Sequence, residues 1–293
     1  MKKILILGGT GMLGHRLYLS LKEFYDVKIT IRDNFNSIKH FGIFKKEEVR
    51  ENVDALNFDS IIRAMASFQP DIVINCIGLI KQLPLSSDPI YSININSLLP
   101  HRISLVCASS GIRFIHISTD CVFSGLKGNY TEDDQSDATD LYGRSKYLGE
   151  VYYKPHSLTL RTSIIGLELK DKLGLIEWFL KQENSIKGFT RAIYSGFTTI
   201  ELAKIISNLI IPNESITGLY HLSSDYISKY DLLNIVKQVY HKSIEIIPDH
   251  SFFCDRSLNS DKFKLQSSYK PPNWTTMITE MKESETHYLK MHN

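Results

Sequence analysis

A glycine-rich turn directly follows the first apolar segment of the chain. Residues 3–7 form an apolar run suited to a strand buried on both faces, and a helical pattern begins at Met12, after a GxxGxxG turn. In this order a pyrophosphate can approach the backbone closely and meet the N-terminal amides of the helix. The turn therefore predicts a nucleotide-binding βα unit, against the alternative of an inert strand–helix corner. The residues expected to line the phosphates are Gly8, Thr10, Gly11, Met12, Leu13 and Gly14.

Strand and helix patterns alternate as far as residue 161, which is typical of a parallel, doubly wound sheet. We therefore predict a Rossmann-type α/β fold. Pro100 predicts a kink or restart in the third long helix. The expected strands are 3–7, 27–31, 72–75, 113–117 and 157–160, and the expected helices are 12–24, 59–68, 89–109 and 141–153.

The pattern loosens after Arg161, which indicates a second and smaller part of the chain. We expect an NAD(P)-binding Rossmann domain over residues 1–163, with returning segments of 190–225, and a mixed α/β substrate-binding lobe mainly over residues 164–293. The acidic segment 131–140 is expected to be a solvated loop. In the C-terminal part the expected helices are 199–211, 229–240 and 275–288, the expected strand is 219–222, and 250–273 is polar and punctuated by proline.

Two charged residues end the second expected strand. In dinucleotide-binding folds an acidic residue near this position holds the ribose 2′-hydroxyl, whereas an arginine accommodates a 2′-phosphate. Arg32 therefore favours NADPH, while the adjacent Asp33 keeps NADH as an alternative. The alternative interpretation of Arg32 is a surface charge at the end of a strand.

Charge and composition exclude several classes of partner. The chain has 34 Lys and Arg against 32 Asp and Glu, and this balance disfavours nucleic acid as the main partner. Its 4 cysteines are scattered without a CxxC pair, which favours reduced thiols over a disulfide framework or a zinc site. No apolar run reaches the length of a membrane helix, and the first one breaks into glycines too early for a signal peptide. We expect a cytoplasmic chain with no membrane partner and no metal.

Tyr142 and Lys146 are four residues apart on an expected helix and therefore share one face. A nearby ammonium stabilises tyrosinate, so this pair suits a proton donor to a carbonyl oxygen. Thr119 follows the expected strand 113–117, at the carboxyl end where open parallel sheets bind their ligands. The order Thr, Tyr, Lys is that of the short-chain dehydrogenases.

With these motifs the chain resembles the extended short-chain dehydrogenase/reductases, and among them the dTDP-4-dehydrorhamnose reductases and related nucleotide-sugar 4-ketoreductases. The glycine turn is shared across that superfamily, whereas the STD and YGxSK motifs are more specific to the reductase branch. The matching segments are 8–14, 75–78, 95–100, 118–125, 142–150, 161–163, 195–203, 218–224 and 256–260.

The resemblance implies roles for individual residues. Thr119 would orient the substrate oxygen, Tyr142 would be the general acid, and Lys146 would bind the nicotinamide ribose and tune Tyr142. The resemblance implies NADPH-dependent reduction of the 4-keto group of a nucleotide-linked 4-keto-6-deoxy sugar, for deoxysugar or surface polysaccharide biosynthesis. Further cofactor contacts are expected from Asp54, Cys76, Ile77, Gly78 and Asn96, and substrate contacts from Thr119, Asp120, Cys121, Ile164 and Arg256.

The chain departs from the family pattern where relatives contact the sugar. Cys121 replaces the tyrosine of the usual Ser-Thr-Asp-Tyr motif, Ile164 replaces an aromatic residue, and residues 78–82 differ from the usual run of small residues. The sequence therefore leaves open the sugar, its nucleotide carrier, the stereochemistry at C4 and whether the chain forms a homodimer. The alternative functions are an epimerase or epimerase-reductase of the same superfamily, and a non-catalytic NADP-binding regulatory subunit.

Overall fold

The computed structural model describes residues 1–290, which divide into two compact units. Unit 1 consists of Met1–Thr119, Thr139–Leu160 and Ala203–Leu219, and unit 2 consists of Asp120–Ala138, Arg161–Leu202 and the segment from Tyr220 onward. The functional division expected from the sequence, into a cofactor domain and a substrate lobe, stays a prediction, because compactness alone does not show what a unit binds.

The central feature is a seven-stranded sheet with the order β10-β6-β5-β4-β1-β2-β3. The register of its neighbours is parallel from β3 through β6, and the order 3-2-1-4-5-6 is that of a Rossmann fold. The predicted fold class is therefore confirmed. The strands are β1 (Lys3–Leu7), β2 (Asp26–Thr30), β3 (Val49–Arg50), β4 (Ile72–Asn75), β5 (Arg113–Ile117), β6 (Ser157–Arg161) and β10 (Gly218–His221).

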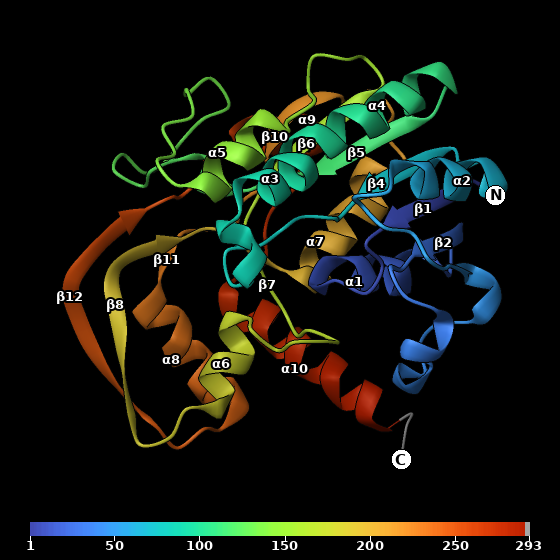
Figure 1. Ribbon diagram of the computed structural model, residues 1–293. Coiled ribbons are helices and arrows are strands. Elements are labelled where there is room, and N and C mark those ends of the chain that lie inside the picture. The colour runs from blue at the N-terminus through green and yellow to red at the C-terminus, as the bar shows by residue number, and fades with distance from the viewer. Residues whose placement is uncertain (291–293) are drawn as a thin grey trace. The chain divides into compact units, whose positions relative to one another are not determined.

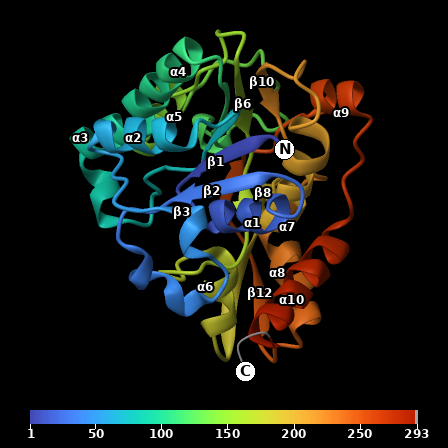
Figure 2. The same ribbon diagram turned by 90° about the vertical axis from the view of Figure 1, so that its right-hand side faces the viewer.

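Helices cover both faces of this sheet (Figures 1 and 2). The face with α2, α4 and α5 holds a buried cluster in which Leu5 and Leu7 of β1 pack with Phe58 and Phe68 of α2. The opposite face carries α1 and η7, which contact one another. Burial on both faces explains why β1 is a continuous apolar run. The helices around the sheet are α1 (Met12–Leu21), α2 (Phe58–Phe68), α3 (Pro89–Ser92), α4 (Leu99–Ser109), α5 (Leu141–Leu148) and α7 (Thr199–Ile205), with the π-helical segments η5 (Ile93–Leu98) and η7 (Ile206–Ile210).

The long helix expected over residues 89–109 is interrupted, although not by a simple kink. The π-helical segment η5 joins α3 to α4 immediately before Pro100. Proline has no N–H, so Pro100 cannot donate the helical hydrogen bond to the carbonyl of Asn96. The backbone of Gly149 packs on that carbonyl, and a Cβ at Gly149 would lie 1.9 Å from the Asn96 oxygen.

The same contact explains why α5 is shorter than expected. The sequence predicts a helix over 141–153, whereas α5 ends at Leu148 and Gly149 is its C-cap residue. The chain leaves the helix where its backbone meets η5, and Glu150 is consequently buried, with 3% of its surface exposed.

Unit 2 contains a three-stranded mixed sheet with the order β11-β8-β12, in which β12 runs parallel and β11 antiparallel to β8 (Figure 1). The sequence predicts neither β8 nor β12, because both are half-exposed and β12 contains Pro248. An edge strand tolerates proline, since one side of its backbone has no strand partner. The strands of unit 2 are β7 (Ile164–Ile165), β8 (Ser185–Tyr194), β9 (Phe197–Thr198), β11 (Ile227–Ser228) and β12 (Glu245–Asp255).

The helices of unit 2 agree in part with those expected. The helix α8 matches the expected 229–240, and the last helix, α10, begins one residue before the expected 275. Two short helices were not predicted by the sequence. The helices are α6 (Leu175–Lys181), α8 (Lys229–Tyr240), α9 (Asp261–Ser267) and α10 (Trp274–Lys290). Of the helices in the described part of the chain, none combines the length and the apolar character needed to cross a membrane.

The buried cluster on β5 gives a prediction for stability. Phe114 is fully buried in the cluster shared by α2 and α4, so Phe114→Ala should lower the free energy of unfolding by about 3–5 kcal/mol. Leu105→Ala on α4 is the matched control, because that side chain is 64% exposed, and should change it by less than about 0.5 kcal/mol. Urea denaturation followed by circular dichroism measures both, and equal midpoints would contradict this packing.

Candidate active site

The glycine turn between β1 and α1 has the tight geometry that its sequence predicts. Gly8 has φ +82°, a left-handed conformation that side chains disfavour, and the N–H of Gly11 donates to its carbonyl at 3.1 Å. A Cβ at Gly14 would lie 2.2 Å from the Gly8 oxygen, so α1 packs directly on the turn. Close packing also requires a glycine at Gly9, which the sequence did not reveal, because a Cβ there would lie 2.3 Å from the Ile29 side chain of β2.

The N-terminus of α1 is open to a ligand. Gly11 is its N-cap residue and no side-chain hydrogen bond caps it in the described structure. A Cβ at Gly11 would meet only the Gly8 oxygen, at 3.3 Å, so the space beside Gly11 is open toward the turn. Free backbone amides at a helix N-terminus favour an anion such as a phosphate.

The segment after β4 lies beside this turn. A Cβ on Gly8 would lie 3.2 Å from the side chain of Ile77 and 3.3 Å from the backbone of Cys76. Asn96 of η5 is 1% exposed and binds both backbone groups of Leu79, because its side chain accepts from Leu79 N–H at 2.8 Å and donates to Leu79 O at 3.1 Å. The expected position of Asn96 at the site is therefore explained by its support of this loop.

Lys146 of α5 is buried and reaches the end of β5. Its Nζ donates to the carbonyl of Ile117 at 2.8 Å, two residues before Thr119. Nζ also lies 3.9 Å from the Cβ position of Gly78. Tyr142 is one helical turn earlier on α5 and is partly exposed. Unit 1 therefore brings the lysine to the strand end that carries Thr119, and beside the loop predicted to line the cofactor.

Burial controls the protonation of this site. It lowers the pKa of Lys146 to about 8, and the negative charge of Glu150 opposes this shift. Burial raises the pKa of the Cys76 thiol to about 12, while the charge of Lys146 opposes that change. Burial also lowers the pKa of His116 well below its ordinary value, with the Lys146 charge adding to the effect. Cys76 is thus a neutral thiol and His116 a neutral imidazole around a lysine that titrates in a physiological range.

Three contacts of this site were not predicted from the sequence. The hydroxyl of Ser118 donates to Oε1 of Glu150 at 2.7 Å, and both side chains are buried. Nζ of Lys81 lies 5.4 Å from the centre of the Tyr142 ring and 2.8 Å from Asp140 Oδ2. All three join segments that are distant in sequence, so no local pattern signals them.

The residues expected near the adenosine end lie at the edge of the sheet beyond β2. Arg32 and Asp33 are exposed after β2. The N–H of Val53 donates to the carbonyl of Ile31, which brings the segment of Asp54 back to the end of β2. Asp54 begins the turn into α2 and accepts from Leu56 N–H through Oδ1. The structure leaves both Arg32 and Asp33 accessible to a ribose or its phosphate.

Unit 2 brings two of the expected substrate residues together. Arg256 donates from Nε to the carbonyl of Phe123 at 2.8 Å, and its Nη1 lies 3.8 Å from Sγ of Cys121. Asp120 begins the short helix η6 (Asp120–Val122), and its N–H donates to the carbonyl of Thr162. Ile164 lies on β7, which pairs with β9.

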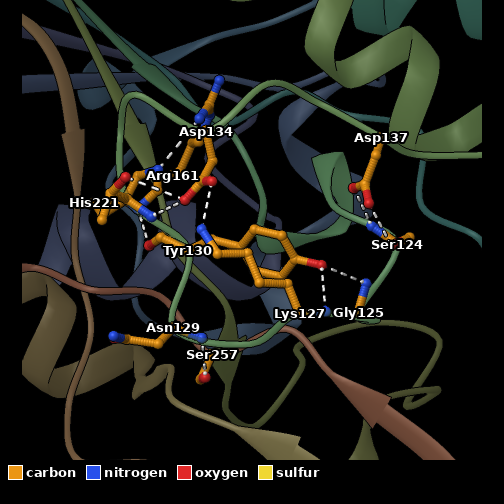
Figure 3. Close-up of polar contacts among 11 residues, drawn as sticks. Ser124, Gly125, Lys127, Asn129, Tyr130, Asp134, Asp137, Arg161, His221 and Ser257 are labelled. Atoms are coloured by element: carbon orange, nitrogen blue, oxygen red, sulfur yellow. Dashed lines mark hydrogen bonds and ion pairs between the residues drawn. The ribbon is translucent and has the colours of Figure 1, made fainter.

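The segment that follows η6 is fixed by Tyr130 (Figure 3). The N–H groups of Gly125 and Lys127 donate to the Tyr130 hydroxyl, at 3.2 and 3.1 Å. Asp137 accepts from Ser124 N–H at 2.7 Å, and Lys127 forms an ion pair with Asp134. The acidic segment 131–140 is thus a hydrogen-bonded loop rather than a simply solvated one.

The chain is similar to known proteins in sequence and in fold. The model of the family described as RmlD substrate binding domain matches residues 1–286. A crystal structure of dTDP-4-dehydrorhamnose reductase from Bacillus anthracis in complex with NADP is similar in fold, with a TM-score of 0.80 and 21% identity, over 97% of this chain and 100% of that one.

Two curated relatives are similar over part of their length. The chain is 29% identical over 189 residues to the protein named probable low-salt glycan biosynthesis reductase Agl14 of Haloferax volcanii, which is 59% of this chain and 60% of that protein. It is 28% identical over 149 residues to methionine adenosyltransferase 2 subunit beta of Rattus norvegicus, 51% of this chain and 42% of that one. The chain thus aligns with less than two thirds of either relative.

The close packing of the turn gives a testable difference between two of its glycines. Gly14→Ala should lower the free energy of unfolding by about 1–3 kcal/mol, because the new methyl group overlaps the Gly8 carbonyl. Gly11→Ala is the matched control, since its nearest neighbour is at 3.3 Å, and should be close to wild type. Thermal unfolding distinguishes them; a Gly14→Ala variant as stable as Gly11→Ala would contradict the packing.

Proposed function

Since the chain belongs to the RmlD substrate binding domain family, we propose that it is an oxidoreductase that reduces a nucleotide-linked sugar with a nicotinamide cofactor. The observation that carries this proposal is the buried Lys146, which lies one helical turn from Tyr142 and bonds to the strand end that carries Thr119. A protein that only binds a nucleotide has no need of an ammonium beside a phenol. Unit 1 would thus be the cofactor domain and unit 2 the substrate lobe.

The residues of unit 1 fit a dinucleotide. The open space at Gly11 and the uncapped N-terminus of α1 suit a pyrophosphate, and the backbone of Cys76, Ile77 and Gly78 would line the nicotinamide half. Arg32 at the end of β2 favours NADPH, with Asp33 as the residue that would accept NADH instead. When bound, the cofactor supplies the hydride.

The residues of the chain would supply and position the proton. Lys146 would hold the nicotinamide ribose and stabilise the phenolate form of Tyr142 by its charge. Tyr142 would donate its hydroxyl proton to the carbonyl oxygen as the C4 carbon is reduced, which yields an alcohol. Thr119 would orient that oxygen by a hydrogen bond. Asn96 would act indirectly, because it holds the loop at Leu79.

We propose a 4-keto-6-deoxy sugar linked to a nucleotide as the substrate class, in deoxysugar or surface polysaccharide biosynthesis. The names of the similar proteins support this class, because they include a dTDP-4-dehydrorhamnose reductase and a glycan biosynthesis reductase. Asp120, Cys121, Ile164 and Arg256 would contact the sugar. Cys121 beside Arg256 replaces an aromatic contact of relatives with a thiol, so the preferred sugar would differ from theirs.

A non-catalytic regulatory subunit is the second candidate function. The similarity to methionine adenosyltransferase 2 subunit beta favours it, since that protein is named as a subunit of another enzyme. An epimerase of the same superfamily is a further alternative. Cofactor that remains bound through purification would support the epimerase, and a stoichiometric enzyme partner without turnover would support the subunit.

The test of the proposal is oxidation of NADPH, followed by absorbance, against dTDP-, UDP- and GDP-linked 4-keto-6-deoxy sugars. Turnover with one member would establish the reaction and its substrate class together. Tight binding of NADPH without turnover on any member would reject the reductase in favour of the alternatives.

Tyr142→Phe should lower kcat by about 10²–10⁴-fold, because the variant lacks the proton that general acid catalysis transfers. Its affinity for NADPH should stay within about twofold of wild type by fluorescence titration, since the phenol is not the main cofactor contact. Tyr147→Phe on the exposed side of the same helix is the matched control. Equal kcat in the two variants would remove Tyr142 from its proposed role.

Gly11→Val should abolish binding of NADPH while the protein stays folded. The valine side chain would enter the space beside the turn, where the pyrophosphate is expected, and its Cβ would meet only the Gly8 oxygen, at 3.3 Å. Calorimetric titration measures the binding, and circular dichroism checks the fold. Wild-type affinity in this variant would place the phosphates elsewhere.

A further inference from the structure

Glu150 is a buried carboxylate that the mechanism above does not use. It is 3% exposed and lies two residues beyond the end of α5. Its Oε1 accepts the hydroxyl proton of Ser118 at 2.7 Å, and Ser118 is itself 5% exposed. A buried carboxylate is costly unless other groups compensate its charge and satisfy its lone pairs. The groups that compensate the charge of Glu150 therefore indicate its role in the protein.

The backbone leaves α5 in a turn that buries the Glu150 side chain. Gly149 ends α5 and packs on the Asn96 carbonyl so closely that a Cβ there would be 1.9 Å from the oxygen. The N–H of the next residue but one, Val151, donates to Thr159 Oγ1 on β6 at 3.1 Å. Both contacts hold the segment between α5 and β6 against the rest of unit 1, and Glu150 lies between them.

Glu150 and Lys146 contact consecutive residues of the same strand end. Lys146 Nζ donates to the carbonyl of Ile117, and the Ser118 hydroxyl donates to Glu150. Glu150 lies past the end of α5, so the lysine reaches the strand end from the helix and the carboxylate reaches it from the turn that follows the helix. The residue after Ser118 is Thr119. One pair of opposite charges thus joins α5 to the strand end that carries the proposed substrate-orienting hydroxyl.

We infer that Glu150 is a positioning residue that keeps Lys146 charged and fixes the Ser118–Thr119 strand end, an inference that rests on the proposed function. The carboxylate would act through its charge on Lys146 and through its hydrogen bond on Ser118. These two actions are separable, because substitutions at positions 150 and 118 can remove the charge and the hydrogen bond one at a time.

The charge effect has a definite sign. Burial lowers the pKa of Lys146 to about 8, and the charge of Glu150 is the main effect that opposes this. The other titratable groups near Lys146 are His116 of β5, whose burial keeps it neutral, and Tyr142 on α5 itself. Loss of the Glu150 charge should lower the pKa of Lys146 further. The ammonium would then lose its proton at a lower pH than in wild type.

Two variants separate the charge from the hydrogen bond. Glu150→Gln keeps an oxygen that can accept from Ser118 and removes the charge. Ser118→Ala removes the hydrogen bond and keeps the charge. Glu150→Asp retains the charge on a shorter side chain and guards against a misfolded glutamine variant. The affinity for NADPH is measured by fluorescence titration from neutral to alkaline pH, and kcat is measured over the same range. The fall in affinity at alkaline pH is called the alkaline limb, and Lys146→Met tests whether Lys146 causes it.

In wild type, NADPH affinity should fall as the pH rises through about 8, and Lys146→Met should abolish this dependence. Glu150→Gln should move the limb by about one pH unit toward acid, as expected for the loss of an adjacent opposite charge. Glu150→Asp should leave it near the wild-type position. Ser118→Ala should leave the limb in place and lower kcat by about fivefold, because Thr119 loses its support.

Two results would overturn the inference while NADPH binding still supports the proposed function. One is that the affinity of Glu150→Gln falls at the same pH as that of wild type. The other is that Ser118→Ala shows the acid shift expected for Glu150→Gln. A limb that persists in Lys146→Met also overturns it, since the titrating group would then be another. A wild-type chain that binds no nicotinamide cofactor at any pH overturns the proposed function, and this inference with it.

Discussion

The hydrogen bond from Lys146 to the carbonyl of Ile117 joins the two elements on which the candidate site of unit 1 depends. One end belongs to α5, which also carries Tyr142, and the other to the end of β5, which leads to Thr119. Because the lysine is buried, this bond and the charge of Glu150 both help to stabilise its ammonium form. The strength of charge interactions in such a place explains why this ammonium affects the pKa of the Cys76 thiol and of the His116 imidazole.

Close backbone packing supports this arrangement at two places. The first is the turn between β1 and α1, where Gly14 lies against the Gly8 carbonyl. The second is the contact of Gly149 with the carbonyl of Asn96, which ends α5 and turns Glu150 inward. In both places a glycine allows two backbones to approach where any side chain would separate them. The glycine turn and the end of α5 are thus positioned by contacts between backbones.

The fold of unit 1 was predictable because its signals are local. The apolar strands, the glycine turn and the alternation of strand and helix each occupy a short stretch of sequence, and the parallel sheet follows from their order. Unit 2 was less predictable, because β8 and β12 are half-exposed strands whose polar residues hide the alternation. Pro248 reinforced the expectation of a loop, although an edge strand accepts it.

The sequence by itself determined the family, the Rossmann fold, the glycine turn and the i, i+4 pairing of Tyr142 with Lys146, because these depend on residue type and on spacing along one element. Only the tertiary structure decided what surrounds that pair. The bond of Lys146 to Ile117 and the bond of Ser118 to Glu150 join segments that are distant in sequence. The burial that keeps Cys76 and His116 neutral likewise comes from packing between such segments. Burial sets the pKa of the lysine, and burial is a property of the packed chain that no local pattern contains.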